Sequence, residues 1–260
     1  MRILTRALAF AAVPLMLGAP GAARACKVAE DYRAPTNLEL AAEANLIVLG
    51  QVVGATEAVR APDEARSSAI AVRPLATIKG LTPGDTLVLP GMMLATPGAA
   101  AEPAAAAVDF AEPHPEARAG GCLRRSFTAG ATVLFFLRRE DGAWVPAGGP
   151  LSRWAEDVPG AEAAWVQLAT LYAHAAQLAE TERAALLEDQ LEALQARIDA
   201  EPGDDPATLA LATDIERTMA APGFPALAER RPAPAAAPPA ESADLGQLGA
   251  GIDALAPDRK

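Results

Sequence analysis

The fold depends on two apolar stretches, ATVLFFLR at residues 131–138 and NLIVLGQVV at residues 45–53. Each is a short run of β-branched, aliphatic and aromatic residues, which is typical of a strand buried on both faces. Gly50 lies inside the second run, and a glycine within a strand indicates a bulge or a close approach of another backbone. The two stretches therefore predict the centre of a β-sheet.

Further strands are expected next to these two. Residues 69–79, AIAVRPLATIK, carry β-branched residues in near-alternation, and Pro74 predicts that this strand lies at a sheet edge or contains a bulge. A strong turn signal at 82–85 separates it from TLVLP at 86–90, and the two runs together predict a hairpin.

A second hairpin is predicted around Glu140-Asp141-Gly142, which forms a tight turn between 131–138 and AWVPA at 143–147. The large aromatic side chains of this hairpin are expected to lie in the core, because aromatic residues in adjoining strands are usually core residues. They are Phe135, Phe136 and Trp144.

After residue 160 the apolar period becomes that of helices, and residues 151–220 are predicted to be a helical segment. Thr181 can cap a second helix after a kink, and Asp205-Pro206 is a typical start of another helix. The inner stripes are narrow and rich in alanine, so these helices either pack on the β domain or require a partner. Their apolar positions are Trp165, Leu168, Tyr172, Ala176, Leu187, Leu191, Leu194, Ile198, Leu211, Ile215 and Met219.

Two segments are dominated by alanine, proline and glycine. This composition buries too little apolar surface to offset the entropy of ordering the chain. Residues 91–121 are therefore expected to be a mobile insertion between strands, and residues 221–260 a disordered tail. Apolar residues within 244–255 leave two alternatives, a docking motif and a chance pattern, and three glycines there argue against a stable helix and favour chance.

Residues 1–25 have the layout of a secretory signal peptide. A basic start precedes an apolar run that is too short to span a bilayer, and Ala23-Arg24-Ala25 matches an A-x-A cleavage site. The alternative is a buried first helix. Because no later run is long and apolar enough to cross a bilayer, the mature protein is expected to be periplasmic or secreted, with no integral membrane segment.

The chain is acidic, with a formal net charge of −11 at pH 7. Removing residues 1–25, which hold three arginines and no acid, lowers the charge from −11 to −14. A chain with this excess of negative charge is not expected to bind nucleic acid or anionic lipid through bulk electrostatics.

The sequence has two cysteines, Cys26 and Cys122, and a disulfide between them is the default in an oxidising compartment. A bridge that closes so long a loop would stabilise the fold by about 4–5 kcal/mol on the chain-entropy model. Cleavage after Ala25 would make Cys26 the first residue, which raises lipidation of Cys26 as an alternative. Arg24 argues against lipidation, because lipoprotein signals are apolar or small at this point.

The sequence lacks the motifs of several common enzyme classes: G-x-S-x-G, H-E-x-x-H, a Walker loop and a dinucleotide fingerprint. Its two histidines, His114 and His174, lie in a proline-rich loop and in a helical segment, so no metal site and no cofactor are predicted. Catalysis would depend on carboxylates, and the candidates lie in turns, where a solvated charge is the ordinary explanation: Asp85, Glu140 and Asp141. We expect a protein that is not an enzyme and that has no catalytic residues.

Several features occur in a characteristic order. A cysteine directly follows the signal peptide; then come ANLIVLGQV at 44–52, a strand ending at Ile78-Lys79-Gly80, Cys122, and a glycine-led strand at 130–137. This order resembles the netrin-like modules of the tissue inhibitors of metalloproteinases and their bacterial relatives. The resemblance covers residues 26–147 and implies a closed five-stranded barrel of the OB type.

In that family the free α-amine and carbonyl of the first cysteine bind the catalytic zinc of a target protease, and the next side chain enters the pocket beside it. The resemblance therefore implies that Cys26 and Lys27 form a partner-binding tip. A deprotonated amine is a good zinc ligand, and a disulfide that makes the tip rigid lowers the entropy cost of docking. This chain departs from the family pattern at Lys27, where a small hydroxyl residue is usual, and at Val28, where the inhibitors have a second cysteine.

We therefore predict an α+β protein: a signal peptide at 1–25, a small OB-like antiparallel β-barrel domain at 26–150 with a mobile insertion at 91–121, a helical segment at 151–220 and a disordered tail at 221–260. The predicted function is non-enzymatic binding of a protein partner outside the cytoplasm, with a zinc protease as the candidate partner. The alternative is an envelope assembly or scaffolding protein that acts through its C-terminal helices.

Overall fold

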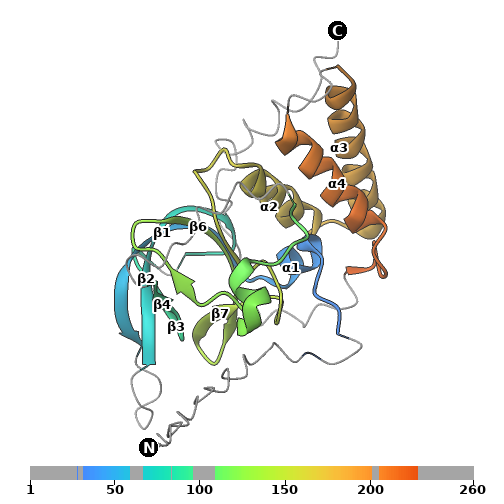
Figure 1. Cartoon of the computed structure of the whole chain (residues 1–260). Helices are drawn as coiled ribbons and strands as arrows, with labels where there is room; N and C mark the ends of the chain where they lie inside the picture. Colours follow the sequence, from blue (N-terminus) through green and yellow to red (C-terminus); the bar gives the residue numbers. More distant parts are fainter. Residues whose placement is uncertain are drawn as a thin grey trace, which may run out of the picture.

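The structure, a computed structural model, places an antiparallel β-sheet beside a group of helices (Figure 1). The predicted signal peptide, the predicted tip at Cys26 and Lys27, and the tail after Leu227 lie outside the residues that it describes. The described residues are 28, 32–58, 67–82, 84–95, 109–200 and 205–227.

The sheet contains each strand that the sequence predicts, and the mixed α+β class is confirmed. Its strand order is β3-β2-β1-β6-β7, with β8 also paired to β6, and all of these pairs are antiparallel. A short parallel pair, β4 (Met93–Leu94) with β5 (Ser126–Phe127), is separate from it. The strands of the main sheet are β1 (Leu46–Ala58), β2 (Ser67–Lys79), β3 (Leu87–Pro90), β6 (Thr132–Glu140), β7 (Ala143–Pro146) and β8 (Ala155–Asp157).

Gly50 allows β1 and β2 to pack closely. It pairs with Pro74, and the register between the two strands shifts between Leu49 and Gly50. A Cβ atom on Gly50 would lie 2.4 Å from Val72 Cγ1 and 3.7 Å from Phe135 Cε2. Of the alternatives predicted for Pro74, an edge or a bulge, the register shift confirms the bulge. The close backbone approach predicted at Gly50 is also confirmed, because a Cβ there would lie 3.3 Å from the Arg73 carbonyl oxygen.

The sheet is not closed into a barrel, which corrects the closed barrel expected from the resemblance. The edge strands β3 and β7 come within 8 Å of each other, measured between Cα atoms. No ladder joins them in the described part of the chain. Each has only four residues, so neither offers a long row of backbone groups for pairing.

The two faces of the sheet carry separate cores. Phe135 and Phe136 are neighbours on β6 and are both fully buried, because successive side chains of a strand point to opposite faces. Phe135 belongs to the core on the concave side, where its ring lies 5.7 Å from that of Phe127 and 6.0 Å from that of Trp154, measured between centroids. Phe136 belongs to the core shared with the helices, and its ring lies 5.6 Å from that of Trp165.

The described residues include four α-helices, two of which start at side-chain caps. The first has a capping box, in which Thr36 accepts from the backbone of Glu39 and the Glu39 side chain accepts from the backbone of Thr36. The predicted start at Asp205-Pro206 is confirmed, because the Asp205 carboxylate accepts from two backbone N–H groups of the first turn. The helices are α1 (Asn37–Glu43), α2 (Ala164–Ala175), α3 (Glu180–Ala200) and α4 (Pro206–Met219). Thr181, predicted to cap a second helix, lies inside α3, and α2 starts without a side-chain cap.

The helices pack on the sheet rather than leaving their apolar stripes uncovered. In Figure 1, α2 lies next to the sheet, while α3 and α4 lie farther from it. One continuous core contains Ile47 of β1, Phe136 of β6, Leu168 of α2 and Ile215 of α4. Of the two alternatives stated for the narrow helical stripes, packing on the β domain or requiring a partner, the structure shows packing on the β domain.

Three predicted segments differ from the structure. The disordered tail is predicted to begin at 221, but residues 221–227 are packed: Leu227 is buried in the core shared with the helices, and the Arg183 guanidinium donates to the Pro225 carbonyl. β8 lies inside the range expected to be helical, and it pairs with β6, so residue 150 is not a boundary between two units.

Within the insertion predicted at 91–121, residues 91–95 include the buried Met92 and strand β4. Residues 109–121 also carry packed structure, including the buried Phe110 and a π-helical turn, η1 (Ala117–Gly121). One aromatic side chain anchors a stretch whose composition is otherwise unfavourable for packing. Residues 96–108 lie outside the described residues.

Replacing Gly50 with alanine tests the contact between β1 and β2. The added methyl would overlap Val72, so Gly50→Ala is expected to lower the free energy of unfolding by about 1–3 kcal/mol, as overpacking does. The matched control is Gly54→Ala in the same strand, where a Cβ would meet nothing within 4 Å. Urea unfolding of both variants measures the difference, and equal stabilities would contradict the close approach.

Candidate functional site

The predicted tip, Cys26 and Lys27, lies outside the described residues, and the Cys26–Cys122 disulfide stays a prediction. The structure does describe the segment that follows the tip and the region around Cys122. These two parts of the chain meet at one loop, Gly-Gly-Pro-Leu-Ser at residues 148–152, which is called the clamp loop here. The clamp loop directly follows Ala147 at the end of β7.

The clamp loop holds the N-terminal segment through Tyr32. The Tyr32 hydroxyl donates to the carbonyl of Pro150 and lies 3.4 Å from the carbonyl oxygen of Gly148. Partial burial raises the pKa of the Tyr32 phenol, and the charge of Glu43 acts in the same direction. The phenol therefore stays protonated, and able to donate, through the neutral range.

The same loop holds Cys122. The Leu151 N–H donates to the Cys122 carbonyl across 2.6 Å. Both residues have φ at +59°, although neither is a glycine, and only one other described non-glycine residue, Asp141, has a positive φ. Such backbone conformations cost of order 1–3 kcal/mol and cluster at functional sites. Two of the three strained residues are thus hydrogen-bonded to each other beside the predicted bridge.

Two glycines shape the clamp loop. Gly148 and Gly149 have φ values of +80° and +71°, which glycine adopts readily. A Cβ on Gly148 would lie 2.7 Å from Leu40 Cδ1 and 3.0 Å from Pro35 Cγ. The Gly148 N–H also donates to the Glu43 carboxylate across 3.1 Å. The loop therefore fits closely against α1 and the segment before it.

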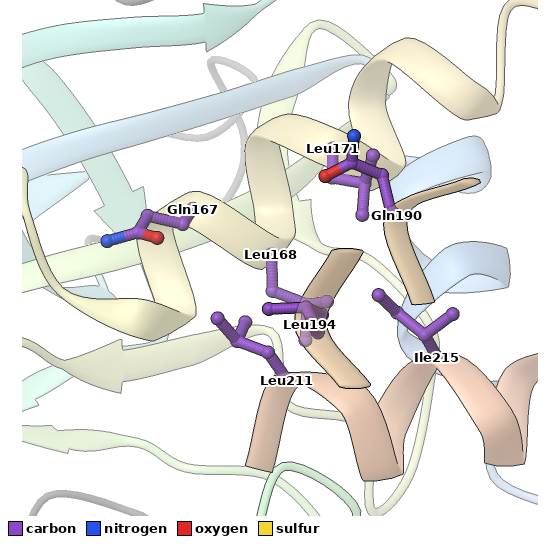
Figure 2. Close-up of a pocket in the computed structure, with 7 residues that line it drawn as sticks. All are labelled: Gln167, Leu168, Leu171, Gln190, Leu194, Leu211 and Ile215. Atoms are coloured by element: carbon purple, nitrogen blue, oxygen red, sulfur yellow. The ribbon is translucent and has the colours of Figure 1, made fainter. Parts of the chain in front are cut away.

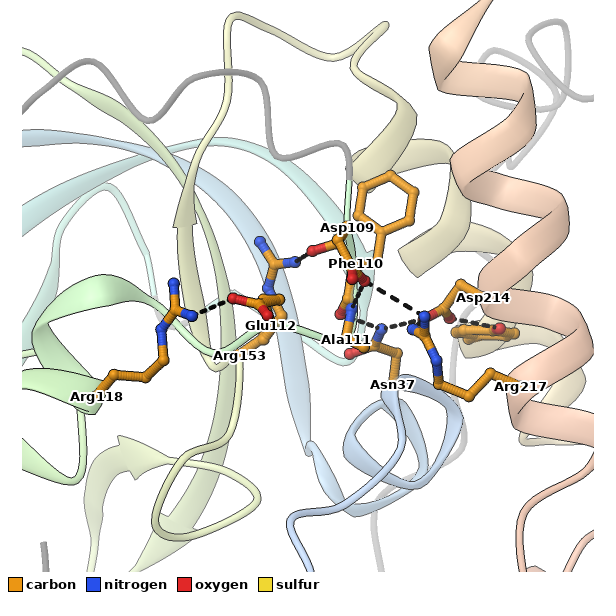
Figure 3. Close-up of polar contacts among 10 residues, drawn as sticks. Asn37, Asp109, Phe110, Ala111, Glu112, Arg118, Arg153, Asp214 and Arg217 are labelled. Carbon is orange, nitrogen blue, oxygen red and sulfur yellow. Dashed lines mark hydrogen bonds and ion pairs between the residues drawn. The ribbon is translucent and has the colours of Figure 1, made fainter.

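A second polar cluster lies deep between the helices and the segment at 109–112 (Figure 3). The Asn37 side-chain amide donates to the Phe110 carbonyl and to the Asp214 carboxylate, across 2.9 Å in each case. The Tyr172 hydroxyl donates to the same carboxylate across 2.8 Å. The Thr218 hydroxyl oxygen lies 3.0 Å from the Tyr172 hydroxyl oxygen. The side chains of Asn37, Tyr172, Asp214 and Thr218 are all buried, so α1, α2 and α4 are joined by one internal network.

Arg153 extends this network toward the sheet. Its guanidinium makes two contacts of 3.0 Å with the Glu156 carboxylate and donates to the Asp109 carbonyl across 2.7 Å. It also lies over the Trp165 ring, 5.0 Å from the centroid, and Trp165 stacks on Phe110. Because Phe110, Glu156 and Trp165 are buried, this cluster fixes residues 109–112 against the helices. This cluster, called the structural lock here, therefore has a structural role.

A shallow apolar pocket lies between α2, α3 and α4 (Figure 2). Its lining offers no acid, base or nucleophile, so it has no groups for catalysis. The lining residues are Gln167, Leu168, Leu171, Gln190, Leu194, Leu211 and Ile215.

The other candidates from the sequence do not gather into a site. His114 lies before η1, where its Nδ1 accepts from the Glu116 N–H across 3.2 Å, and burial lowers its pKa, with the charge of Arg124 adding to the effect. His174 is exposed on α2. Among the described residues, no group of three or more His, Cys, Asp or Glu side chains is arranged so that it could hold a metal ion. The candidate carboxylates are exposed: Asp85 lies in a bend, Glu140 is the last residue of β6, and Asp141 lies in the turn that follows it.

Comparison with known proteins adds no family. No family model matches the chain, and no curated protein matches it with significance.

The clamp loop was missed by sequence reasoning, although Gly148-Gly149-Pro150 is a turn signal. Its partners, at Tyr32 and Cys122, are distant in the sequence and could not be inferred from it.

The length and hydropathy of a helix decide whether it can cross a membrane. Within the described ranges, no helix has both the length and the hydropathy needed to cross a bilayer.

Replacing Gly148 with alanine tests the fit of the clamp loop. Gly148→Ala is expected to lower the free energy of unfolding by about 1–3 kcal/mol more than Gly130→Ala does. Gly130 is the matched control because its φ is +84°, close to that of Gly148, while a Cβ there would meet nothing within 4 Å. Chemical unfolding measures both. Equal losses would mean that backbone strain alone, and not contact with Pro35 and Leu40, explains the effect.

The network around Asp214 predicts a pH dependence. Burial raises the pKa of Asp214 more than Tyr172, Arg217 and Asn37 lower it, so the folded state binds the proton more tightly than the unfolded state does. The contribution of this group to stability is therefore fully present below its ordinary pKa and is lost as the pH rises through the raised value. Asp214→Asn removes this titration.

The expected result is that the free energy of unfolding of Asp214→Asn, minus that of wild type, becomes more positive as the pH rises from about 4 to about 7. Urea unfolding at a series of pH values measures this difference. A difference that does not change with pH would show that Asp214 titrates alike in the folded and unfolded chains.

Proposed function

We propose that this chain is an exported, non-enzymatic protein-binding module that presents its mature amino terminus from the clamp loop. The observation that carries the proposal is that one five-residue loop bonds both Tyr32, which follows the tip, and Cys122, the predicted partner of Cys26. A binding tip that is held in place before docking loses less conformational entropy when the partner binds.

The spacing of the chain supports a bridge between Cys26 and Cys122. Tyr32 follows Cys26 by six positions, and six extended residues span at most about 20 Å. Because Tyr32 and Cys122 both bond to the clamp loop, this spacing along the chain allows a bridge between Cys26 and Cys122. The mature terminus would then be restrained at two points, the bridge and the Tyr32 hydroxyl.

The sheet supports kinship with netrin-like modules of the OB type. β1, β2 and β3 form an antiparallel meander, and β6 pairs with the other side of β1. The two edges that face each other, β3 and β7, are those whose approach would complete a barrel. OB barrels are commonly only partly closed, so the open sheet is compatible with this kinship.

The sharper form of the proposal is inhibition of a zinc metalloprotease. The α-amine and carbonyl of Cys26 would bind the zinc of the protease, and the side chain of Lys27 would enter the adjoining pocket. Restraint at the clamp loop supplies the rigidity that such a tip needs.

The alternative, assembly or scaffolding through the C-terminal helices, has less support. Leu168 of α2, Leu194 of α3 and Ile215 of α4 are buried in the protein's own core. A partner would have to bind the outward faces of these helices, and no feature described above favours this.

Adding a single alanine before Cys26 tests the proposal. Mature protein that starts at Cys26, confirmed by mass spectrometry, is assayed against a panel of zinc proteases. The extension blocks the α-amine, so inhibition is expected to weaken by about 100-fold, the effect of losing a binding hot spot.

The matched control carries the alanine after Lys260 and should inhibit as the unmodified protein does. If the N-terminal extension leaves inhibition unchanged, the amine does not bind the zinc. If the unmodified protein inhibits no protease of the panel, the proposed inhibition is wrong.

A further inference from the structure

His114 caps the helical turn that leads to Cys122. Its backbone carbonyl accepts from the N–H groups of Ala117 and Arg118, across 2.9 Å and 3.3 Å, and its side-chain Nδ1 accepts from the Glu116 N–H across 3.2 Å. The Glu116 N–H lies in the first turn, where backbone N–H groups have no carbonyl partner inside the helix, so the imidazole supplies its acceptor. An Nδ1 that accepts carries no proton, so the ring is neutral, with its proton on Nε2.

The capped turn is joined to β5 through the side chain of Glu116. Its carboxylate accepts from the Arg125 N–H across 3.1 Å, from the Ser126 N–H across 3.0 Å and from the Ser126 hydroxyl across 3.1 Å. Ser126 begins β5, which pairs with β4. Because His114 holds the backbone of Glu116 and the side chain of Glu116 holds Ser126, a change at the imidazole reaches β5.

The charged groups around His114 give an imidazolium little support. Arg124 is buried, and its guanidinium is fixed by two contacts of 2.9 Å with the Asp157 carboxylate. Asp157 is therefore already paired, and Glu156 is paired in the same way with Arg153, across 3.0 Å. The groups that face the ring are Arg124 from the stretch before β5, Glu156 and Asp157 from β8, and Glu116 from its own turn.

Protonation of His114 carries two costs in the folded chain. Burial lowers the pKa of His114, and the charge of Arg124 lowers it further. A protonated Nδ1 donates rather than accepts, so the Glu116 N–H loses its acceptor. Because the folded state binds the proton less tightly than the unfolded state, the contribution of this group to stability is present above the ordinary pKa of histidine. It is lost as the pH falls through the lowered value.

We propose that His114 is a pH-sensitive switch: the neutral imidazole holds the turn at 114–118 closed against β5, and protonation in mildly acidic surroundings opens it. Arg124 is fixed in the interior, so the repulsion is relieved by movement of the turn and not of the arginine. The open turn withdraws the Glu116 carboxylate from the backbone of residues 125–126. This inference goes beyond the proposed function and does not depend on it.

Hydrogen exchange of the peptide that covers residues 114–127, followed by mass spectrometry, tests the switch. The full chain is compared at about pH 7.5 and about pH 5, on either side of the ordinary pKa of histidine. Each exchange rate is divided by the rate of an unfolded chain at the same pH, which gives a protection factor. Protection is expected to fall about five- to tenfold in acid, the effect of losing one hydrogen bond. The peptide at 131–138 in β6 is the internal reference and should keep its protection.

Two variants of His114 separate its charge from its role as an acceptor. In His114→Asn the side-chain amide oxygen can accept from the Glu116 N–H and does not titrate, so protection is expected to be alike at both pH values. His114→Ala removes the acceptor and should show low protection at both. The matched control is His174→Asn, which replaces the other histidine of the chain, exposed on α2, and should behave as wild type does.

Four results would overturn the switch. The first is wild-type protection that changes less than about twofold between the two pH values. The second is a loss of protection in acid that is as large in His114→Asn as in wild type, because another group would then titrate. The third is an equal loss in the reference peptide at 131–138, which would mean that acid unfolds the whole protein. The fourth is full protection of His114→Ala at the higher pH.

Discussion

The pairing of β1 with β6 is the interaction on which the rest of the structure depends. Residues 46–51 pair with 132–137, and both strands bury side chains on both faces. Each face then needs a cover, since buried apolar area drives the packing. On one face the strand side chains pack with Phe127 and Trp154, and on the other they pack with α1 and α2. The helices are therefore part of the same body as the strands.

The buried polar network has a different role. An ion pair such as Arg153–Glu156 contributes little net stability when its desolvation is counted, but removing one partner is strongly destabilising. What the network supplies is geometry. Asn37 donates to the Phe110 carbonyl, Arg153 donates to the Asp109 carbonyl, and Arg217 pairs with the Asp109 carboxylate, so this segment is held against the helices. The same segment leads through η1 to Cys122. The structural lock thus holds the start of residues 109–122, and the clamp loop bonds Cys122 at their end.

Local patterns predicted the elements well where their cause was local. The turn at Asp141-Gly142 has positive φ at both residues, as a two-residue hairpin turn requires, and Asp205 caps α4 as its sequence predicts. Local patterns did not predict the elements whose formation depends on a tertiary contact rather than on composition. Phe110 is buried although its neighbours are alanine and proline, β8 is a strand of three residues, and α1 has seven residues, too few for a periodic signal.

The sequence by itself determined strands β1, β2, β3, β6 and β7, their hairpins, the start of α4 at Asp205 and the glycine that the β1–β2 contact requires, because propensity, periodicity and turn chemistry act over a few residues. Only the tertiary structure decided that the sheet stays open, that the helices cover it, and that the clamp loop meets Tyr32 and Cys122. Tyr32 and Pro150 are 118 positions apart, and nothing in the chain near either one encodes the other. Contacts of that range follow from how the β1–β6 pair places its neighbours, which is a property of the folded chain.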